Sequence, residues 1–222
     1  MPSDDGDGSG DDIDGTTSDV GVGPWEGPWP DDPHFDPDLL TNGDRRNVID
    51  RYRYWSNDAI VADLDTRRHP FHVAIENFQH DRNIGTVVRT ANAFGAAGVH
   101  IVGKRRWNRR GAMVTDRYVH LHHHPDTASL VRWADDARLP LVGVDILPGA
   151  EAIETAQLPT ACVLVFGQEG PGLSDDAHTA CGQVLAITQY GSTRSINAGV
   201  AAGIAMHTWV RQHAGPPPAS NA

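Results

Sequence analysis

Between residues 69 and 213, short apolar runs rich in β-branched residues alternate with segments of helical periodicity. The apolar runs are Phe71–Ile75, Val99–Val102, Leu141–Ile146, Cys162–Phe166 and Val184–Ile187. The helical patterns fall near residues 84–95, 126–138, 174–181 and 195–212. Near-continuous apolar strands between helices are typical of a parallel sheet that helices cover on both faces. The sequence therefore predicts an α/β fold for residues 69–213.

The remaining residues form three shorter segments. Residues 1–38 are rich in Asp, Gly and Pro and bury too little apolar surface to offset their chain entropy, so a disordered acidic tail is expected. Residues 39–68 interleave arginines with aromatic and aliphatic residues, which predicts an N-terminal extension of two short helices. Residues 214–222 are expected to be a flexible C-terminus.

For some residues of these segments the sequence predicts a particular role. Trp25, Trp29 and Phe35 are the large apolar residues of the tail that could dock on another surface. Candidate N-caps for the two helices are Asn42 or Asp44 for the first, and Ser56 or Asn57 for the second.

The acidic residues are concentrated at the N-terminus, so the net charge of the whole chain does not describe the rest of it. The formal net charge of −11 would by itself argue against a polyanionic partner. However, 12 of the 29 acidic residues lie in residues 1–38, which contain no Lys or Arg. The remaining 17 acidic residues accompany all 18 basic residues in the rest of the chain, so a nucleic-acid partner is not excluded.

Several classes of protein are disfavoured by the sequence. It has no run of 18 apolar residues and its first residues lack a basic start and an apolar stretch, so neither a membrane span nor a secretory signal is expected. The two cysteines, Cys162 and Cys181, are too few for a disulfide framework, which favours a reducing, cytoplasmic location. The run His120–His124 lacks Cys or acidic partners at ligand spacing, so we expect a polar surface strand and no metal site.

The first chemically distinctive segment is Asn83–Gly95, which follows one predicted strand and begins a helix. Its apolar positions predict one buried side, and Arg89 falls near that side. A buried guanidinium requires an anionic partner, so Arg89 is either one half of a structural ion pair or a functional group.

Two further segments follow predicted strands. In the segment from Leu164 to Ser174, a glycine-rich loop carries Glu169 at the carboxyl end of a strand, where α/β sheets bind ligands; a tight turn is the alternative. In the segment from Ile187 to Met206, a polar loop precedes a helix rich in Gly and Ala, and close helix packing alone would also explain that composition.

Together the three segments resemble the SpoU/TrmH family of SPOUT RNA ribose 2′-O-methyltransferases. The first motif of the family, N-x-G-x-x-x-R-x-x-x-x-F-G, is matched by Asn83, Gly85, Arg89, Phe94 and Gly95. The second, G-x-E-G-x-G-[LM]-S, is matched by Gly167, Glu169, Gly170, Gly172, Leu173 and Ser174. The third, I-P-M-x-G-x-x-x-S-L-N-V-S-x-A, is matched by Ile187, Gly191, Ser195, Asn197 and Ala201, whereas its Pro-Met pair reads Thr188-Gln189.

The resemblance implies a SPOUT-type parallel sheet with a deep C-terminal trefoil knot, a homodimer with the last helix at its interface, and S-adenosylmethionine as methyl donor. The donor would bind at Gly167, Ile187, Gln189 and Ile196. Arg89 would be the catalytic arginine, supported by Asn83, Glu169, Ser195 and Asn197. Because a free guanidinium is a poor base, we expect Arg89 to position a phosphate and stabilise charge more than to remove the proton itself.

An RNA substrate needs a basic surface, and the segment after Val102 supplies one. Its residues combine guanidinium groups for phosphates with an indole for a splayed base, although a merely solvated loop is the alternative; they are Lys104, Arg105, Arg106, Trp107, Arg109 and Arg110. The short extension at residues 39–68 favours transfer RNA over ribosomal RNA as the substrate. A non-catalytic RNA-binding knot protein is the remaining alternative.

Overall fold

The computed structural model describes residues 21–79, 81, 83–168 and 170–215. The chain divides into two compact units, one within residues 1–60 and one within residues 61–222.

The first unit is built around aromatic side chains and two short helical segments, α1 (Pro37–Asn42) and η1 (Asp50–Tyr52). The ring of Trp25 lies edge-on to two others, with centroids 5.9 Å from Phe35 and 5.3 Å from Tyr54. The backbone amide of Trp25 also donates to the carbonyl of Leu40 at 2.8 Å. The expectation of a disordered segment up to residue 38 is therefore wrong for residues 21–38, and residues 1–20 lie outside the described residues.

A buried ion pair holds this unit together. Asp44 is fully buried, and its carboxylate accepts hydrogen bonds from the Arg46 guanidinium at 2.9 and 2.7 Å and from the backbone amide of Tyr54 at 3.0 Å. Burial alone would raise the pKa of Asp44, but these hydrogen bonds outweigh it and lower the pKa below its usual value. Arg46 therefore has a structural role.

One of the two predicted helix N-caps is confirmed, and the other is wrong. Ser56 precedes α2 (Asn57–Asp65), and its hydroxyl accepts from the backbone amide of Ala59 at 3.1 Å, as an N-cap does. The first helix is capped by Asp36, whose side chain accepts from Asp38, and neither Asn42 nor Asp44 caps a helix.

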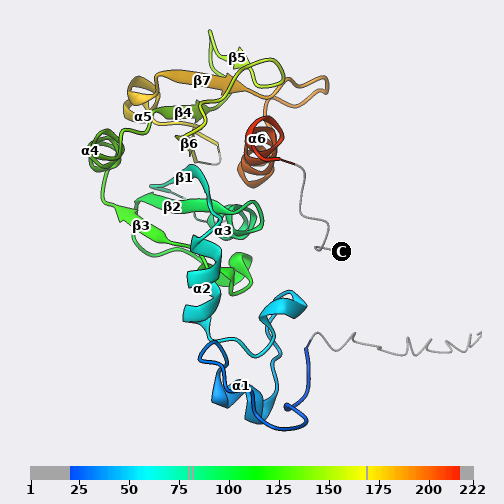
Figure 1. Ribbon diagram of the computed structural model, residues 1–222. Coiled ribbons are helices and arrows are strands. Elements are labelled where there is room, and N and C mark those ends of the chain that lie inside the picture. The colour runs from blue at the N-terminus through cyan, green and yellow to red at the C-terminus, as the bar shows by residue number, and fades with distance from the viewer. Residues whose placement is uncertain (1–20, 80, 82, 169, 216–222) are drawn as a thin grey trace, which may run out of the picture. The chain divides into compact units, whose positions relative to one another are not determined.

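The second unit contains a seven-stranded sheet in which every strand pair is parallel (Figure 1). The strands are β1 (His69–Asn77), β2 (Ala96–Gly103), β3 (Leu121–His124), β4 (Leu141–Val144), β5 (Glu151–Ala152), β6 (Cys162–Phe166) and β7 (Gln183–Ala186). Their order across the sheet is β3-β2-β1-β6-β4-β7-β5. The fully buried β6 lies between β1 and β4, so strands distant in the sequence form the centre of the sheet.

Helices cover both faces of this sheet, as predicted (Figure 1). On one face, α3 (Ile84–Ala93) and α6 (Ala198–His213) bury Val87, Val88 and Met206 in the main core. On the other face, α4 (Thr127–Ala137) and α5 (Asp175–Ala180) bury Leu130 and Ala177 in a second core. The two cores follow from the alternation of side chains along each strand.

The five predicted strands and four predicted helices are all present, with ends that differ by a few residues. The polar strand expected at His120–His124 is β3, although its last residue is buried. The two-residue strand β5 has no counterpart among the predicted runs, because one residue pair carries no periodicity. The longest helix of the described residues, α6, has 16 residues, too few to cross a bilayer.

Candidate functional site

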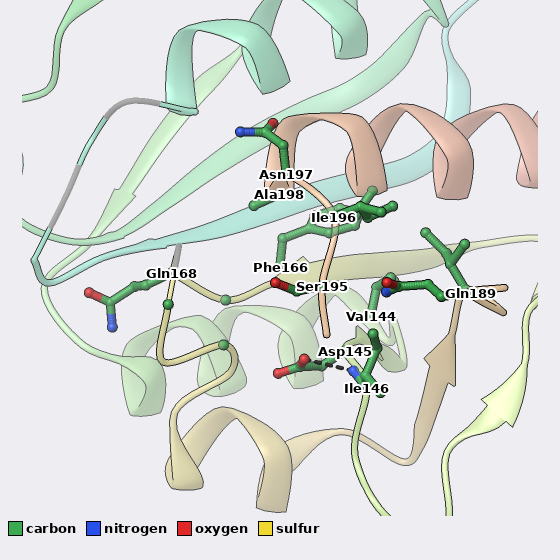
Figure 2. A pocket seen from close by; sticks show the side chains of 15 residues that line it. Val144, Asp145, Ile146, Phe166, Gln168, Gln189, Ser195, Ile196, Asn197 and Ala198 are labelled. Carbon is green, nitrogen blue, oxygen red and sulfur yellow. Dashed lines mark hydrogen bonds between the residues drawn. The ribbon is translucent and has the colours of Figure 1, made fainter. Parts of the chain in front are cut away.

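The principal pocket lies where β4, β6 and β7 end and α6 begins (Figure 2). It has a volume of about 290 Å³ and is lined by Val144, Asp145, Ile146, Phe166, Gly167, Gln168, Gly170, Gly172, Ile187, Gln189, Ser195, Ile196, Asn197, Ala198 and Ala201. The carboxyl ends of parallel strands are the edge at which α/β sheets bind ligands, as the sequence predicted.

A folded-back loop forms one wall of the pocket. The backbones of Gln168 and Gly172 exchange two hydrogen bonds, of 2.9 and 3.0 Å, so the chain reverses directly after β6. The Asp145 carboxylate fixes the end of this loop by accepting from the backbone amide of Leu173 at 2.8 Å. It also accepts from the amide of Ile146 at 2.7 Å. Strand β4 and the loop are thus joined through one carboxylate.

A second carboxylate anchors the same loop from β1. Glu76 is buried, and it accepts hydrogen bonds from the hydroxyl of Ser174 and, at 2.8 Å, from its backbone amide. The Ser174 hydroxyl also accepts from the amide of Ala177 at 3.2 Å and so caps α5. Burial raises the pKa of Glu76. The beginning of α5 is therefore held to strand β1.

The first and third motifs meet at the beginnings of α3 and α6. The Asn197 side-chain amide donates to the side-chain oxygen of Asn83 at 2.9 Å, while its own oxygen caps α6 by accepting from the amide of Gly199 at 2.9 Å. Gly199 lies so close to Thr86 that an added Cβ would be 3.0 Å from the Thr86 methyl group. The two helices consequently pack tightly beside the pocket.

The predicted donor-binding residues are brought together in this pocket. Its lining contains Gly167, Ile187, Gln189 and Ile196 together with Ser195 and Asn197, and Asn83 adjoins it through the bond to Asn197. Glu169 lies outside the described residues.

Arg89 differs from its expected position. It is exposed on α3 and does not line the pocket. The prediction that it lies near the buried side is wrong, because the buried positions Val87 and Val88 precede it directly on the helix. Two residues after Val87 corresponds to about 200° around a helix, which turns the Arg89 side chain away from the sheet.

The predicted basic loop lies against the beginning of α3. Lys104, Arg105, Arg106, Arg109 and Arg110 are exposed. A Cβ on Gly85 would lie 2.7 Å from the backbone of Gly111, so the end of the loop and the first turn of α3 are in close contact. Trp107 is only partly exposed, packs against the main core, and lies 5.6 Å from the Arg109 guanidinium. This leaves less of the indole accessible to a base than the sequence suggested.

Sequence reasoning missed several residues of the pocket and its supports, among them Val144, Asp145, Ile146 and Glu76. Asp145 ends an apolar run, and Glu76 stands at the end of another. The position of both at the carboxyl edge of the predicted sheet was the available signal.

Other catalytic chemistries find little support in the described residues. Among them, no group of three or more His, Cys, Asp or Glu side chains is arranged to hold a metal ion. Burial raises the pKa of Cys162 and of Cys181 to about 12, so both thiols are protonated at neutral pH and are poor nucleophiles.

The fold matches that of solved SpoU methyltransferases. The SpoU methyltransferase AviRb from Streptomyces viridochromogenes, solved with the cofactor AdoMet, aligns with a TM-score of 0.59 and 25% identity, over 68% of this chain and 60% of that one. A solved RNA 2′-O ribose methyltransferase aligns with a TM-score of 0.57 and 25% identity, over 66% and 58% of the two chains. The class defined by the fold is therefore the parallel α/β class of SPOUT proteins.

The sequence comparisons identify the family within this class. The profile of the SpoU rRNA Methylase family matches residues 70–207, and the chain belongs to that family. An uncharacterised tRNA/rRNA methyltransferase from Mycolicibacterium vanbaalenii is 32% identical over 192 residues. That alignment covers 81% of this chain but 60% of the relative, so the chain spans about three fifths of the relative's length.

Proposed function

We propose that this protein is an S-adenosylmethionine-dependent RNA methyltransferase that modifies a ribose 2′-hydroxyl, with transfer RNA favoured over ribosomal RNA. The observation that carries the proposal is the hydrogen bond between Asn83 and Asn197, which joins the first and third motifs beside the pocket that the second motif lines. The preference for transfer RNA is the expectation drawn from the sequence of residues 39–68, and the experiment below tests it.

The residues of the pocket fit the proposed donor. Its volume is near the lower limit, about 300 Å³, of typical small-molecule sites. Val144, Phe166, Ile187 and Ile196 offer apolar walls for a nucleobase, and the glycines of the loop allow a ligand to approach the backbone. When bound, S-adenosylmethionine supplies an activated methyl group, so the protein needs no electrophile of its own.

The remaining chemistry belongs to the acceptor, which has to be oriented and to lose a proton. Asn197 and Ser195, at the beginning of α6, are suited to orient a ribose through hydrogen bonds. Arg89 is available to bind the phosphate next to that ribose, because it is exposed on α3. In this role it positions the acceptor and stabilises the developing charge. Glu169 remains a predicted supporting residue.

The exposed loop at Lys104–Arg110 is the proposed docking surface for the RNA backbone. Its arginines are suited to bidentate phosphate contacts, and its end contacts the first turn of the helix that carries Arg89. Arg109 is the exception, since it also pairs with Asp116 at 3.0 Å.

A homodimer is part of the proposal, and α6 supports it. Val200 and Ile204 are 54% and 36% exposed and lie one turn apart on this helix. Two such side chains on one helix side are typical of an interface, although singly exposed apolar residues are common.

The function is tested with purified protein, tritiated S-adenosylmethionine, and transfer RNA and ribosomal RNA prepared separately from cells that lack this gene. The labelled RNA is digested to nucleosides, which are separated by chromatography and identified by mass spectrometry. We expect label in 2′-O-methylated nucleosides, mainly from transfer RNA, and a loss of most turnover in Arg89→Lys with donor binding retained. Label confined to methylated bases, or wild-type turnover in Arg89→Lys, would contradict the proposal.

A further inference from the structure

The side chain of Gln189 has an unmet hydrogen-bonding requirement. Both its amide nitrogen and its amide oxygen are buried, and neither has a hydrogen-bond partner within the described part of the chain. Leaving a buried amide unpaired is unfavourable, so such groups usually meet a partner that arrives with a ligand or with water.

Gln189 is one of the residues that line the pocket. Figure 2 shows its side chain on the side where Val144 and Ile196 lie, opposite Gln168. The neighbouring walls are apolar, whereas the carboxylate of Asp145 is already engaged with the backbone amides of Ile146 and Leu173. A ligand that fits here combines a flat apolar body with one hydrogen-bond donor and one acceptor on its edge.

The backbone that carries Gln189 is fixed by the preceding residue. The carboxylate of Glu154 accepts hydrogen bonds from the Thr188 amide at 2.9 Å and from its hydroxyl at 3.0 Å. The family pattern has Pro-Met at these two positions, and a proline has no amide hydrogen with which to make the first of these bonds. Both departures from the pattern therefore act together, one anchoring the loop and the other presenting an amide.

We propose that Gln189 recognises the adenine edge of the methyl donor. Its amide oxygen accepts from the 6-amino group, and its amide nitrogen donates to an adjacent ring nitrogen, the pairing that Gln and Asn form with adenine elsewhere. The proposal rests on the proposed function, since it takes the pocket to be the donor site. Gln189 is then a specificity-determining residue of this chain that the thioether of a methionine could not replace.

The test compares two ligands by calorimetry, S-adenosylhomocysteine and its analogue whose purine lacks the 6-amino group. Wild-type protein should bind the adenosyl compound about tenfold more tightly, whereas Gln189→Met should bind both within about threefold, because the buried pairing is lost. Gln183→Met makes the same chemical change on β7 at a residue that does not line the pocket, so it is the matched control and should keep the wild-type ratio.

The outcomes separate this inference from the function on which it rests. If the wild type binds the two ligands equally, or if Gln189→Met keeps the wild-type ratio of affinities, the role of Gln189 is overturned. The proposed methyltransferase function is unaffected by either result. Failure of folded wild-type protein to bind S-adenosylhomocysteine at all overturns the donor site itself, and the role of Gln189 with it.

Discussion

At the scale of single residues, the pocket depends on how closely two stretches of backbone approach each other at Gly167. A Cβ at this position would lie 2.0 Å from the carbonyl carbon of Gly172 and 2.1 Å from the amide nitrogen of Leu173. These atoms belong to the reversed loop that lines the pocket, and backbone cannot move aside as a side chain can. Only glycine is compatible with this crossing.

Gly167→Ala should therefore open the loop. We expect a loss of about 1–3 kcal/mol in the free energy of unfolding, as for other overpacked sites, together with a loss of affinity for S-adenosylhomocysteine. Chemical denaturation and calorimetry measure the two effects. Gly191→Ala is the matched control, since a Cβ there has no neighbour within 4 Å, and it should change stability by less than about 0.5 kcal/mol. Equal behaviour of the two variants would show that the crossing is unimportant.

The residues of the site were predictable to different degrees. Ile187, Ile196 and Asn197 were predicted because they lie in the segment that resembles the third motif of the SpoU/TrmH family. Glu76 and Asp145 were missed because a lone acidic residue at the end of a strand has no pattern of its own. Their partners, Ser174 and Leu173, lie far along the chain, so the contacts exist only in the folded sheet.

At the scale of elements, strands β1, β2 and β3 are linked by a row of histidines. Nδ1 of His72 lies 3.0 Å from Nε2 of His100, and Nδ1 of His100 lies 2.8 Å from Nε2 of His124. Trp133 of α4 covers the row, with ring centroids 4.0 Å from His100. Burial is the main cause that lowers the pKa of His72 to about 4 and that of His100 to about 2, with nearby histidines, including His122, adding to it.

Because the folded protein keeps these histidines neutral, its stability should depend on pH. In the unfolded chain a histidine has a pKa near 6.5, so below that pH the unfolded state binds more protons than the folded state. The free energy of unfolding should fall as the pH decreases from about 7 to 5, by up to about 1.4 kcal/mol per pH unit for each histidine. Denaturant titrations at several pH values measure this slope.

The matched variants are His72→Gln, which cannot titrate, and His178→Gln, which changes an exposed histidine of α5. His72→Gln should reduce the slope by the contribution of one histidine, up to about 1.4 kcal/mol per pH unit, and His178→Gln should leave the slope unchanged. The same slope in the wild type and in His72→Gln would refute a role for the row.

The sequence indicated β3 but not its contacts. The run His120–His124 was interpreted as a polar surface strand. The partners of the buried His124 come from other strands, so no local pattern predicts which of its alternating side chains turns inward. The order of strands was equally hidden, because it depends on crossovers between distant runs.

At the scale of the whole molecule, the composition of residues 1–60 gave a misleading picture. Their polar character suggested a tail followed by two helices, yet residues 21–60 fold around Trp25, Tyr54 and the buried Asp44. A few aromatic contacts and one satisfied ion pair organise this unit. Such contacts contribute little to average hydropathy and leave no periodicity, which explains why the order of residues 21–38 was not predicted, whereas the helix predicted after Ser56 is present as α2.

The largest remaining difference, the exposed Arg89, leads to a prediction about assembly. If two copies pack through α6, the Arg89 of one copy has the opportunity to act at the pocket of the other. Mixed dimers of Arg89→Lys and Ala201→Phe test this, since the second variant fills the proposed donor pocket, which Ala201 lines. Each variant alone should be inactive, provided that both remain folded and dimeric.

The mixture should recover activity if the arginine acts across the interface. In a mixed dimer, one of the two sites then combines the open pocket of the Arg89→Lys subunit with the intact arginine of its partner. On equal mixing about half of the dimers are mixed, and each of these has one working site of two. The mixture should therefore recover about a quarter of the wild-type rate. If Arg89 serves its own pocket, every site in the mixed dimer lacks either the arginine or the donor, and no activity returns. The steady-state rate of methyl transfer at a series of mixing ratios distinguishes these two arrangements.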